Sequence, residues 1–372
     1  MSNGTIAFME CYSPRVCVSY NNARADQPDS WSNILKLLEK QDYKVDIIKE
    51  DLSSRLGEKY NLIIIPGVTK QISELDIAIL ENYILNGGSL LICHDAGGDE
   101  DYATNINRLL RKLGAEFANL DLLWGEEVYK LTDPPQEWIK RPLIKIGIGN
   151  NTYDLFYWGC TIKLRKISKN TEFTDSKLKN VIVSSKELSK ASNIHYSRKY
   201  PCKVEEDPEE RDVDSKLACV KLEVIRKGGS NAILSNVTLF GGKYCFDNTS
   251  IPKPEIDAKI KITQLDKKCK KEVNHAKVFL ELVEITKSKE GTTLSFPYDK
   301  EAKYRILDWL AQKTEIEKQL INLLFGGIVA GIISGSLISV ITAIFQPYSL
   351  YYIVFVVCVL VFSLVFLVRW LK

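Results

Sequence analysis

The hydrophobic pattern of residues 72–117 predicts a helix, a buried strand and a second helix, in that order. Ser73 is a suitable N-cap, because an acidic residue stands three positions later and apolar residues then recur at helical spacing. The glycine pair at 87–88 ends this helix, and the short run SLLIC at 89–93 is typical of a strand buried on both faces. A second amphipathic stripe spans residues 106–113. This order is characteristic of an open parallel sheet.

The preceding residues also alternate between strand and helix. Apolar runs predict strands at residues 15–20, 44–48 and 61–65. A helix capped by Ser30 separates the first two strands, and a helical turn at 51–56 separates the last two. Repeated alternation of this kind requires right-handed crossovers and a parallel sheet. Ligands of such sheets bind at the carboxyl ends of the strands, so we expect a site in the loop after the SLLIC strand.

The alternation of strand and helix does not continue through residues 124–227. There prolines and charge runs separate short strands, and this pattern predicts a mainly β insertion or extension. Its candidate strands are 144–148, 162–167 and 181–184. The run NAILSN at 231–236 is expected to return to the main sheet. Residues 277–284 are expected to form a further strand, and residues 300–320 a helix.

Two uncharged stretches, residues 320–345 and 350–368, are each long enough to cross a hydrocarbon core of about 30 Å. They predict a two-helix transmembrane hairpin with the lipid bilayer as partner. Lysine and arginine flank both outer ends, while the connecting turn has none. The positive-inside rule therefore predicts an integral membrane protein whose soluble domain and termini are cytosolic.

Gly327, Gly331 and Gly335 recur at every fourth position of the first predicted span. Small residues at this spacing let helices approach closely. The glycines could pack the first span against the second, or they could drive self-association into a dimer or larger assembly. Neither span carries a Lys, Arg, His, Asp or Glu residue, which argues against a transporter or a proton relay.

The composition narrows the possible partners and cofactors. A net charge of +3 on a chain of 372 residues implies no nucleic-acid partner. The nine cysteines include no CxxC pair, so free thiols in a reducing compartment are expected. Three histidines and unpaired cysteines provide no zinc cluster with ligand spacing. We therefore expect no metal and no cofactor.

The loop after the SLLIC strand carries the candidate ligand-binding residues Asp95, Gly97, Gly98, Asp99, Thr104, Asn105 and Asn107. Its acidic residues could form a solvated loop that caps the next helix, or a site for a hard cation or polar ligand. The glycines could let a ligand approach the backbone. Thr104, Asn105 and Asn107 stand at a helix start, where free N–H groups could hold an anion, or they could be capping residues.

Within this region the sequence resembles the GIFT domain. The matching pieces are YILNGGSL at 83–90, AGGD at 96–99 and TNIN at 104–107. GIFT domains are glutamine-amidotransferase-like modules of intraflagellar transport B-complex subunits and gliding-motility-type proteins. The resemblance implies a flavodoxin-like sheet and a module that binds and scaffolds rather than catalyses.

A second pattern, IPG at 65–67 followed by ICH at 92–94, is similar to that of PfpI-type peptidases and deglycases. There a Cys–His pair stands at a strand-to-helix elbow, which makes Cys93 and His94 candidate catalytic residues. Asp95 departs from the pattern, because a small glycine follows the histidine in that family. A carboxylate beside a thiolate also disfavours ionisation of the thiol. His94 could equally be an ordinary hydrogen-bonding side chain at a strand end.

The predicted fold class is α/β: a flavodoxin-like, class I glutamine amidotransferase-like parallel sheet with a β-rich insertion and a C-terminal transmembrane hairpin. The predicted divisions are a core at 12–123, the insertion at 124–227, closing elements and linker at 228–319, and the hairpin at 320–368. We expect a membrane-anchored, non-catalytic cytosolic scaffold or ligand sensor with an unidentified protein partner or small ligand. The alternatives are a Cys93/His94 hydrolase or amidotransferase-like enzyme, and a ligand-gated membrane effector.

Overall fold

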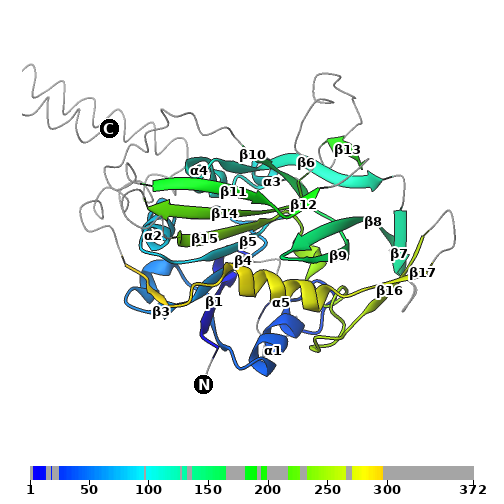
Figure 1. Cartoon of the computed structure of the whole chain (residues 1–372), viewed down its shortest axis with the longest axis horizontal. Coiled ribbons are helices and arrows are strands. Elements are labelled where there is room, and N and C mark those ends of the chain that lie inside the picture. The colour runs from blue at the N-terminus through cyan, green and yellow to red at the C-terminus, as the bar shows by residue number, and fades with distance from the viewer. Residues whose placement is uncertain are drawn as a thin grey trace, which may run out of the picture. The chain divides into compact units, whose positions relative to one another are not determined.

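The computed structural model describes residues 3–13, 18, 25–95, 98–125, 128–131, 136–164, 181–190, 194–198, 217–226, 233–264 and 270–295. A seven-stranded sheet forms the centre of this part of the chain, in the order β11-β14-β15-β5-β4-β1-β2 (Figure 1). Five neighbouring strands are parallel: β15 (Ile233–Phe240), β5 (Leu90–Cys93), β4 (Leu62–Pro66), β1 (Thr5–Met9) and β2 (Lys44–Ile48). The last two, β14 (Cys219–Arg226) and β11 (Val181–Glu187), are antiparallel.

This topology corrects the predicted fold class. The sheet is mixed, because β14 and β11 come from the segment read as an insertion and extend the main sheet antiparallel to β15. Alternating hydrophobicity identifies strands in that segment, but it does not say which sheet they join or in which direction.

The predicted membrane hairpin is also corrected. Among the described residues, no helix is long and apolar enough to span a bilayer. The two predicted spans, 320–345 and 350–368, lie outside the described residues, together with Gly327, Gly331 and Gly335. The structure therefore gives no support to the hairpin, the lipid partner, the integral-membrane location or the glycine-mediated self-association. The fold-class and location predictions that contained them are wrong in this respect.

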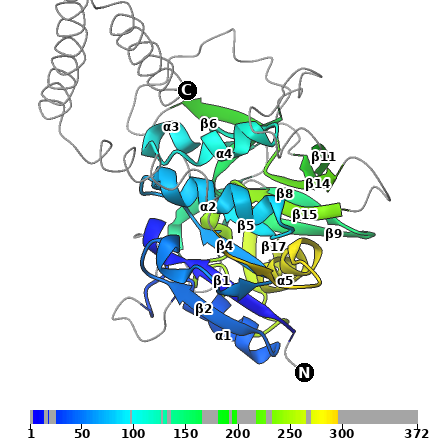
Figure 2. The same cartoon turned by 90° about the vertical axis from the view of Figure 1, so that its left-hand side faces the viewer.

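Helices cover both faces of the parallel strands. Figure 2 shows α2 (Glu74–Leu85) and α4 (Ile106–Lys112) on one side of β4 and β5. The other side is covered by α1 (Ser32–Lys40) and α5 (His275–Thr286). Alternate residues of β4 and β5 enter the two cores, since side chains of a strand point to opposite faces in turn.

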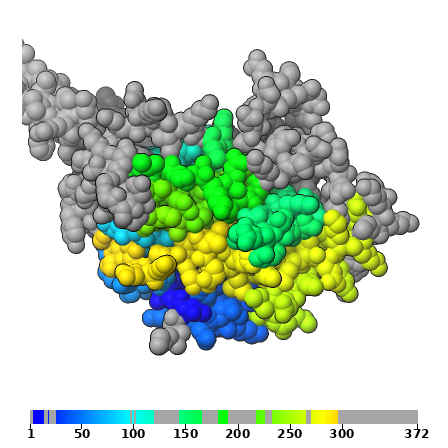
Figure 3. Space-filling model, viewed as in Figure 1, coloured from blue at the N-terminus to red at the C-terminus, as the bar shows by residue number. Residues whose placement is uncertain are grey.

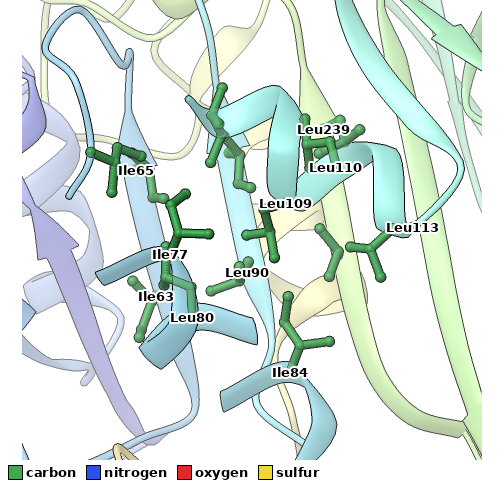
Figure 4. Packing of buried hydrophobic residues seen from close by; sticks show 14 of the residues in the cluster. Ile63, Ile65, Ile77, Leu80, Ile84, Leu90, Leu109, Leu110, Leu113 and Leu239 are labelled. Carbon is green, nitrogen blue, oxygen red and sulfur yellow. The ribbon is translucent and has the colours of Figure 1, made fainter. Parts of the chain in front are cut away.

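The core on the α2 and α4 side is mainly aliphatic. Figure 4 shows Ile63, Ile65 and Leu90 of the sheet meeting the leucines and isoleucines of the two helices. The core on the other side is more aromatic, with Trp31 in edge-to-face contact with Phe8, Phe246 and Phe279. In Figure 3 the yellow surface that includes α5 lies between the green surface of β11 and β14 and the blue surface of the N-terminal elements.

Several predicted elements are confirmed at their boundaries. Ser73 caps α2, and its side chain accepts a hydrogen bond of 3.1 Å from the Asp76 N–H. Gly87 follows that helix with φ of 98°, the left-handed conformation that glycine adopts without strain. The NAILSN run enters β15, which pairs in parallel with β5 as expected.

Two predicted strands are wrong or displaced. The first strand is β1, at Thr5–Met9, whereas the predicted strand at 15–20 lies outside the described residues except for Val18. Residues 277–284 belong to α5 instead of a strand. Asn274 starts this helix by accepting a hydrogen bond of 2.8 Å from the Lys277 N–H, a capping signal that overrides the ambiguous periodicity of the following apolar run.

Three smaller sheets complete the described part. One joins β6 (Ala115–Gly125), β10 (Cys160–Leu164) and β13 (Ile194–Arg198), and another pairs β3 (Lys59–Tyr60) with β18 (Thr292–Thr293). The remaining sheet contains β7 (Val128–Leu131), β8 (Gln136–Ile148), β9 (Asn151–Phe156), β12 (Ser189–Lys190), β16 (Ile260–Gln264) and β17 (Lys270–Val273). Shorter helical segments are η1 (Glu10–Tyr12), η2 (Leu52–Arg55), α3 (Gly98–Tyr102) and η4 (Lys243–Cys245). The predicted domain boundaries stay a prediction.

Candidate functional site

Polar residues collect where the parallel strands end, as expected for an open α/β sheet. Strand β5 ends at Cys93 and is followed by His94 and Asp95. The His94 N–H donates to the Phe240 carbonyl over 2.9 Å, and the Lys243 N–H donates to the His94 carbonyl over 2.8 Å. These two bonds join the turn after β5 to the turn after β15. They therefore fix the backbone that carries the Cys93, His94 and Asp95 side chains.

The Cys93 thiol points away from solvent. Its residue is 0% exposed and lies in the core shared with α1 and α5, among Cys219, Cys245 and Phe240. Burial raises the pKa of the Cys93 thiol well above its ordinary value, and the neighbouring Cys219 and Cys245 raise it further. A thiol in this position remains protonated at neutral pH, whereas nucleophilic attack requires the thiolate.

The His94 side chain is also 0% exposed. Its ring lies 4.7 Å from the ring of Phe117 and 6.2 Å from the ring of Tyr102, measured between centroids. Nδ1 of the ring lies 2.8 Å from the Asp95 backbone nitrogen and 3.3 Å from the Asp95 carbonyl oxygen. Burial lowers the pKa of His94, so the ring is uncharged at neutral pH. Nε2 has no hydrogen-bond partner among the described residues.

Asp95 forms a buried ion pair that the sequence did not predict. Its Oδ2 lies 2.6 Å from Lys243 Nζ, with only 3% and 2% of the two side chains exposed. Tyr102 donates a hydrogen bond of 3.1 Å to the same carboxylate oxygen. The stem of Lys243 passes directly over Gly67, where a Cβ would lie 2.5 Å from the lysine Cδ. Lys243 comes from the distant η4 segment, so no local sequence signal pairs it with Asp95.

Asp99 organises the start of α4. Its carboxylate accepts hydrogen bonds of 3.1 Å from the N–H groups of Thr104 and Asn107, and a further one from the Thr104 hydroxyl. The Asn107 side chain in turn exchanges two hydrogen bonds of 2.8 Å with the backbone of Phe117. Asp99, Thr104 and Asn107 therefore make internal contacts of the capping kind.

The other candidate residues are placed as follows. Asn105 precedes α4 in the left-handed conformation, with φ of 67°, and its side chain contacts the Ile72 carbonyl at 3.4 Å. Gly98 starts α3 with φ of 63°. Gly97 lies outside the described residues. A ligand-binding role for the predicted set stays a prediction.

The chemistry available at this edge follows from these contacts. The one strand-end thiol proposed as a nucleophile is buried, and the adjacent carboxylate is neutralised by a lysine. In the part of the chain that the structure describes, no three His, Cys, Asp or Glu side chains are grouped so that they could hold a metal ion. At this edge the Asp95 and Asp99 carboxylates are therefore paired with groups of the chain itself.

Parallel strands covered by helices on both faces, with polar residues at their carboxyl ends, define an open α/β domain. Residues 22–154 match the family model described as the IFT52 GIFT domain. The chain therefore contains a GIFT domain, and the resemblance seen in its sequence is confirmed.

A curated relative, the intraflagellar transport protein 52 homolog of Mus musculus, is 26% identical over 111 residues. The match covers 30% of this chain and 25% of the mouse protein, so the chain spans about a quarter of the length of that relative. Among solved structures, the chain is similar to the mmIFT52 N-terminal domain, with a TM-score of 0.43 at 15% identity, over 75% of this chain and 95% of that one. Gan42B, a GH42 beta-galactosidase, is similar with a TM-score of 0.34 at 15% identity, over 75% of this chain and 29% of that one.

Proposed function

We propose that the chain is a non-catalytic binding and scaffold module of the intraflagellar transport type. The observation that carries this proposal is the match of residues 22–154 to the GIFT domain. The match includes β5 and the turn after it, where an enzyme of the glutamine amidotransferase-like group would need its nucleophile. A module of this kind acts by holding protein partners, so its surface and not a reaction centre would carry the function.

The turn after β5 supports a non-catalytic role. A nucleophilic cysteine needs solvent access and a lowered pKa. Cys93 is 0% exposed with a raised pKa, and the next residues are held by the His94 backbone bonds and the Asp95–Lys243 ion pair. Reorienting the thiol toward a substrate would require breaking these buried contacts. The alternative of a Cys93/His94 hydrolase or amidotransferase-like enzyme is therefore disfavoured.

The proposed partners are protein subunits of an intraflagellar transport assembly. The likeness to a mouse protein named for intraflagellar transport supports this choice. The match covers about a quarter of the mouse protein, so the individual partners of that whole protein are not assigned to this chain. We include β15 and α5 in the proposed scaffold unit, since β15 pairs with β5 and α5 packs on the core strands.

The proposal is tested by affinity purification of the tagged full chain from a flagellated cell that expresses it. We expect intraflagellar transport subunits to be enriched over an untagged control. Leu110→Asp, which places a charge at a fully buried position of α4, should abolish the enrichment, whereas Lys40→Gln at the exposed end of α1 should preserve it. Recovery of the folded chain without any such subunit would refute the proposed role, as would Cys93-dependent turnover of an amide, ester or aldehyde.

A further inference from the structure

The seven-stranded sheet ends at β11, and within the described part of the chain no strand lies beyond it (Figure 1). The residues of β11 pair one to one with those of β14, without a register shift. Strand edges are usually protected by proline, by a bulge or by charged side chains, because their free backbone groups can pair with another chain. Strand β11 has neither proline nor a bulge, and its charged residues, Lys186 and Glu187, stand at its end.

The register identifies the backbone groups at this outer edge. The Leu188 N–H donates to the Cys219 carbonyl over 3.0 Å, one position beyond the last pair of the β11–β14 ladder. In an antiparallel ladder, such hydrogen-bonded pairs alternate with pairs whose N–H and C=O groups point away from the partner strand. Counting back from Leu188, the backbone groups of Val183 and Ser185 therefore point away from β14, toward the outer edge.

The opposite edge of the sheet, formed by β2, is different. Asp46 lies at the middle of β2, with Arg55 of η2 at 3.9 Å, and its carboxylate accepts a hydrogen bond of 2.7 Å from the Tyr60 hydroxyl. A charged residue inside an edge strand is a common protection against pairing. The middle residue of β11 is Ser184, which is exposed and uncharged. Of these two edges, that of β11 is therefore the one suited to accept a further strand.

The side chains on one face of β11 indicate what kind of strand fits. Ile182 is 47% exposed and lies in register with Ile225 of β14, which is in register with Ile233 of β15. Ile233 is 50% exposed. An apolar side chain opposite Ile182 on an added strand would extend this row, since directly opposite side chains contact each other. Lys186 is exposed on the same face four residues further along, where an acidic side chain would be favoured.

A second copy of this chain does not fit this pattern. Antiparallel pairing of two full β11 strands about Ser184 would place Ile182 of each copy opposite Lys186 of the other. We propose that the outer edge of β11 binds an extended segment of a protein partner, which adds a strand to the sheet and carries an apolar and an acidic side chain four residues apart. Backbone hydrogen bonds supply affinity in this mode of binding, and side chains supply specificity. The inference rests on the proposed scaffold role, because it names a surface that holds a partner.

The proposal is tested with two variants of Ser185 in the tagged full chain, purified from a flagellated cell. Ser185→Pro removes an N–H that points to the outer edge, where edge strands tolerate proline. Ser185→Ala keeps this N–H and is the matched control. We expect the proline variant to recover at least one intraflagellar transport subunit about fivefold less than the alanine variant, the usual effect of losing one hydrogen bond.

The possible outcomes separate this inference from the scaffold role. Equal recovery of every subunit by the two Ser185 variants would overturn the binding edge and leave the scaffold role intact. Absence of subunits from the wild-type chain as well would overturn both. A dimer in size-exclusion chromatography that is lost with Ser185→Pro would show that a second copy occupies the edge, and would overturn the choice of partner.

A second measurement does not depend on variants that fold. In the isolated wild-type chain, NMR should show faster hydrogen exchange at the Ser185 amide than at the Ser184 amide, whose N–H faces β14. Adding the purified subunit that the wild-type chain recovers should slow exchange at Ser185. Unchanged exchange at Ser185 on this addition would contradict the proposal. Slow exchange there in the isolated chain would contradict it too, because the edge would already be covered.

Discussion

Replacing Lys243 with methionine is expected to destabilise the folded chain by about 3–5 kcal/mol, the range typical of removing one partner from a buried ion pair. Lys243 Nζ and Asp95 Oδ2 are 2.6 Å apart, and no more than 3% of either side chain is exposed. At an effective dielectric constant of about 20, unit charges at this distance attract by about 6 kcal/mol. The variant loses this attraction and leaves the Asp95 charge buried, while the methionine retains most of the apolar stem.

The measurement is urea unfolding of the full chain at pH 7, followed by tryptophan fluorescence. Lys259→Met is the matched control, because Lys259 pairs with Glu272 at 3.4 Å with more than half of each side chain exposed. A surface pair of this kind contributes about 0–1 kcal/mol, so the control should change the unfolding free energy little.

A double variant separates the ion pair from the packing of the lysine stem. Lys243→Met combined with Asp95→Leu removes both charges, and should recover part of the stability lost in the single variant. If Lys243→Met lowers the free energy of unfolding no more than Lys259→Met does, the Lys243 and Asp95 charges are not held together in a buried environment. The description of the two as a buried ion pair would then be wrong.

Three further predictions concern other parts of the same edge. Gly241→Ala should destabilise the fold strongly, because its Cβ would lie 1.9 Å from the Cys160 carbonyl oxygen, whereas Gly147→Ala meets nothing closer than 3.8 Å and should be tolerated; thermal unfolding compares them. Burial lowers the pKa of His94, so on acidification the unfolded chain binds a proton at a higher pH than the folded chain does. The free energy of unfolding should therefore fall as the pH drops below about 6.5. His94→Gln should remove this pH dependence in urea titrations. Cys93 should resist iodoacetamide in the native state and react only on unfolding, as peptide mass spectrometry would show.

Elements with strong local signals could be predicted from the sequence. Ser73 with its acidic partner determines where α2 begins, and the apolar SLLIC run determines β5. The boundary of α2 is marked by Gly87, whose positive φ only glycine adopts readily. In each case residues close together in the chain suffice to determine the structure, which is why these predictions are confirmed.

Long-range pairing accounts for most of what the sequence did not predict. The antiparallel strands β14 and β11 join the main sheet through register pairs with β15, and no local pattern encodes that choice. The apolar run in α5 fits both helix and strand periods until Asn274 is recognised as its cap. Lys243 likewise meets Asp95 only through the fold, so the ion pair at the candidate site was not foreseen.

Cross-linking mass spectrometry in flagellated cells tests most directly whether the GIFT domain acts as a transport scaffold. The tagged full chain, expressed at its natural level, should form cross-links from residues 22–154 to intraflagellar transport subunits, and these should disappear with Leu110→Asp. A folded chain that forms no such cross-links would contradict the proposed role.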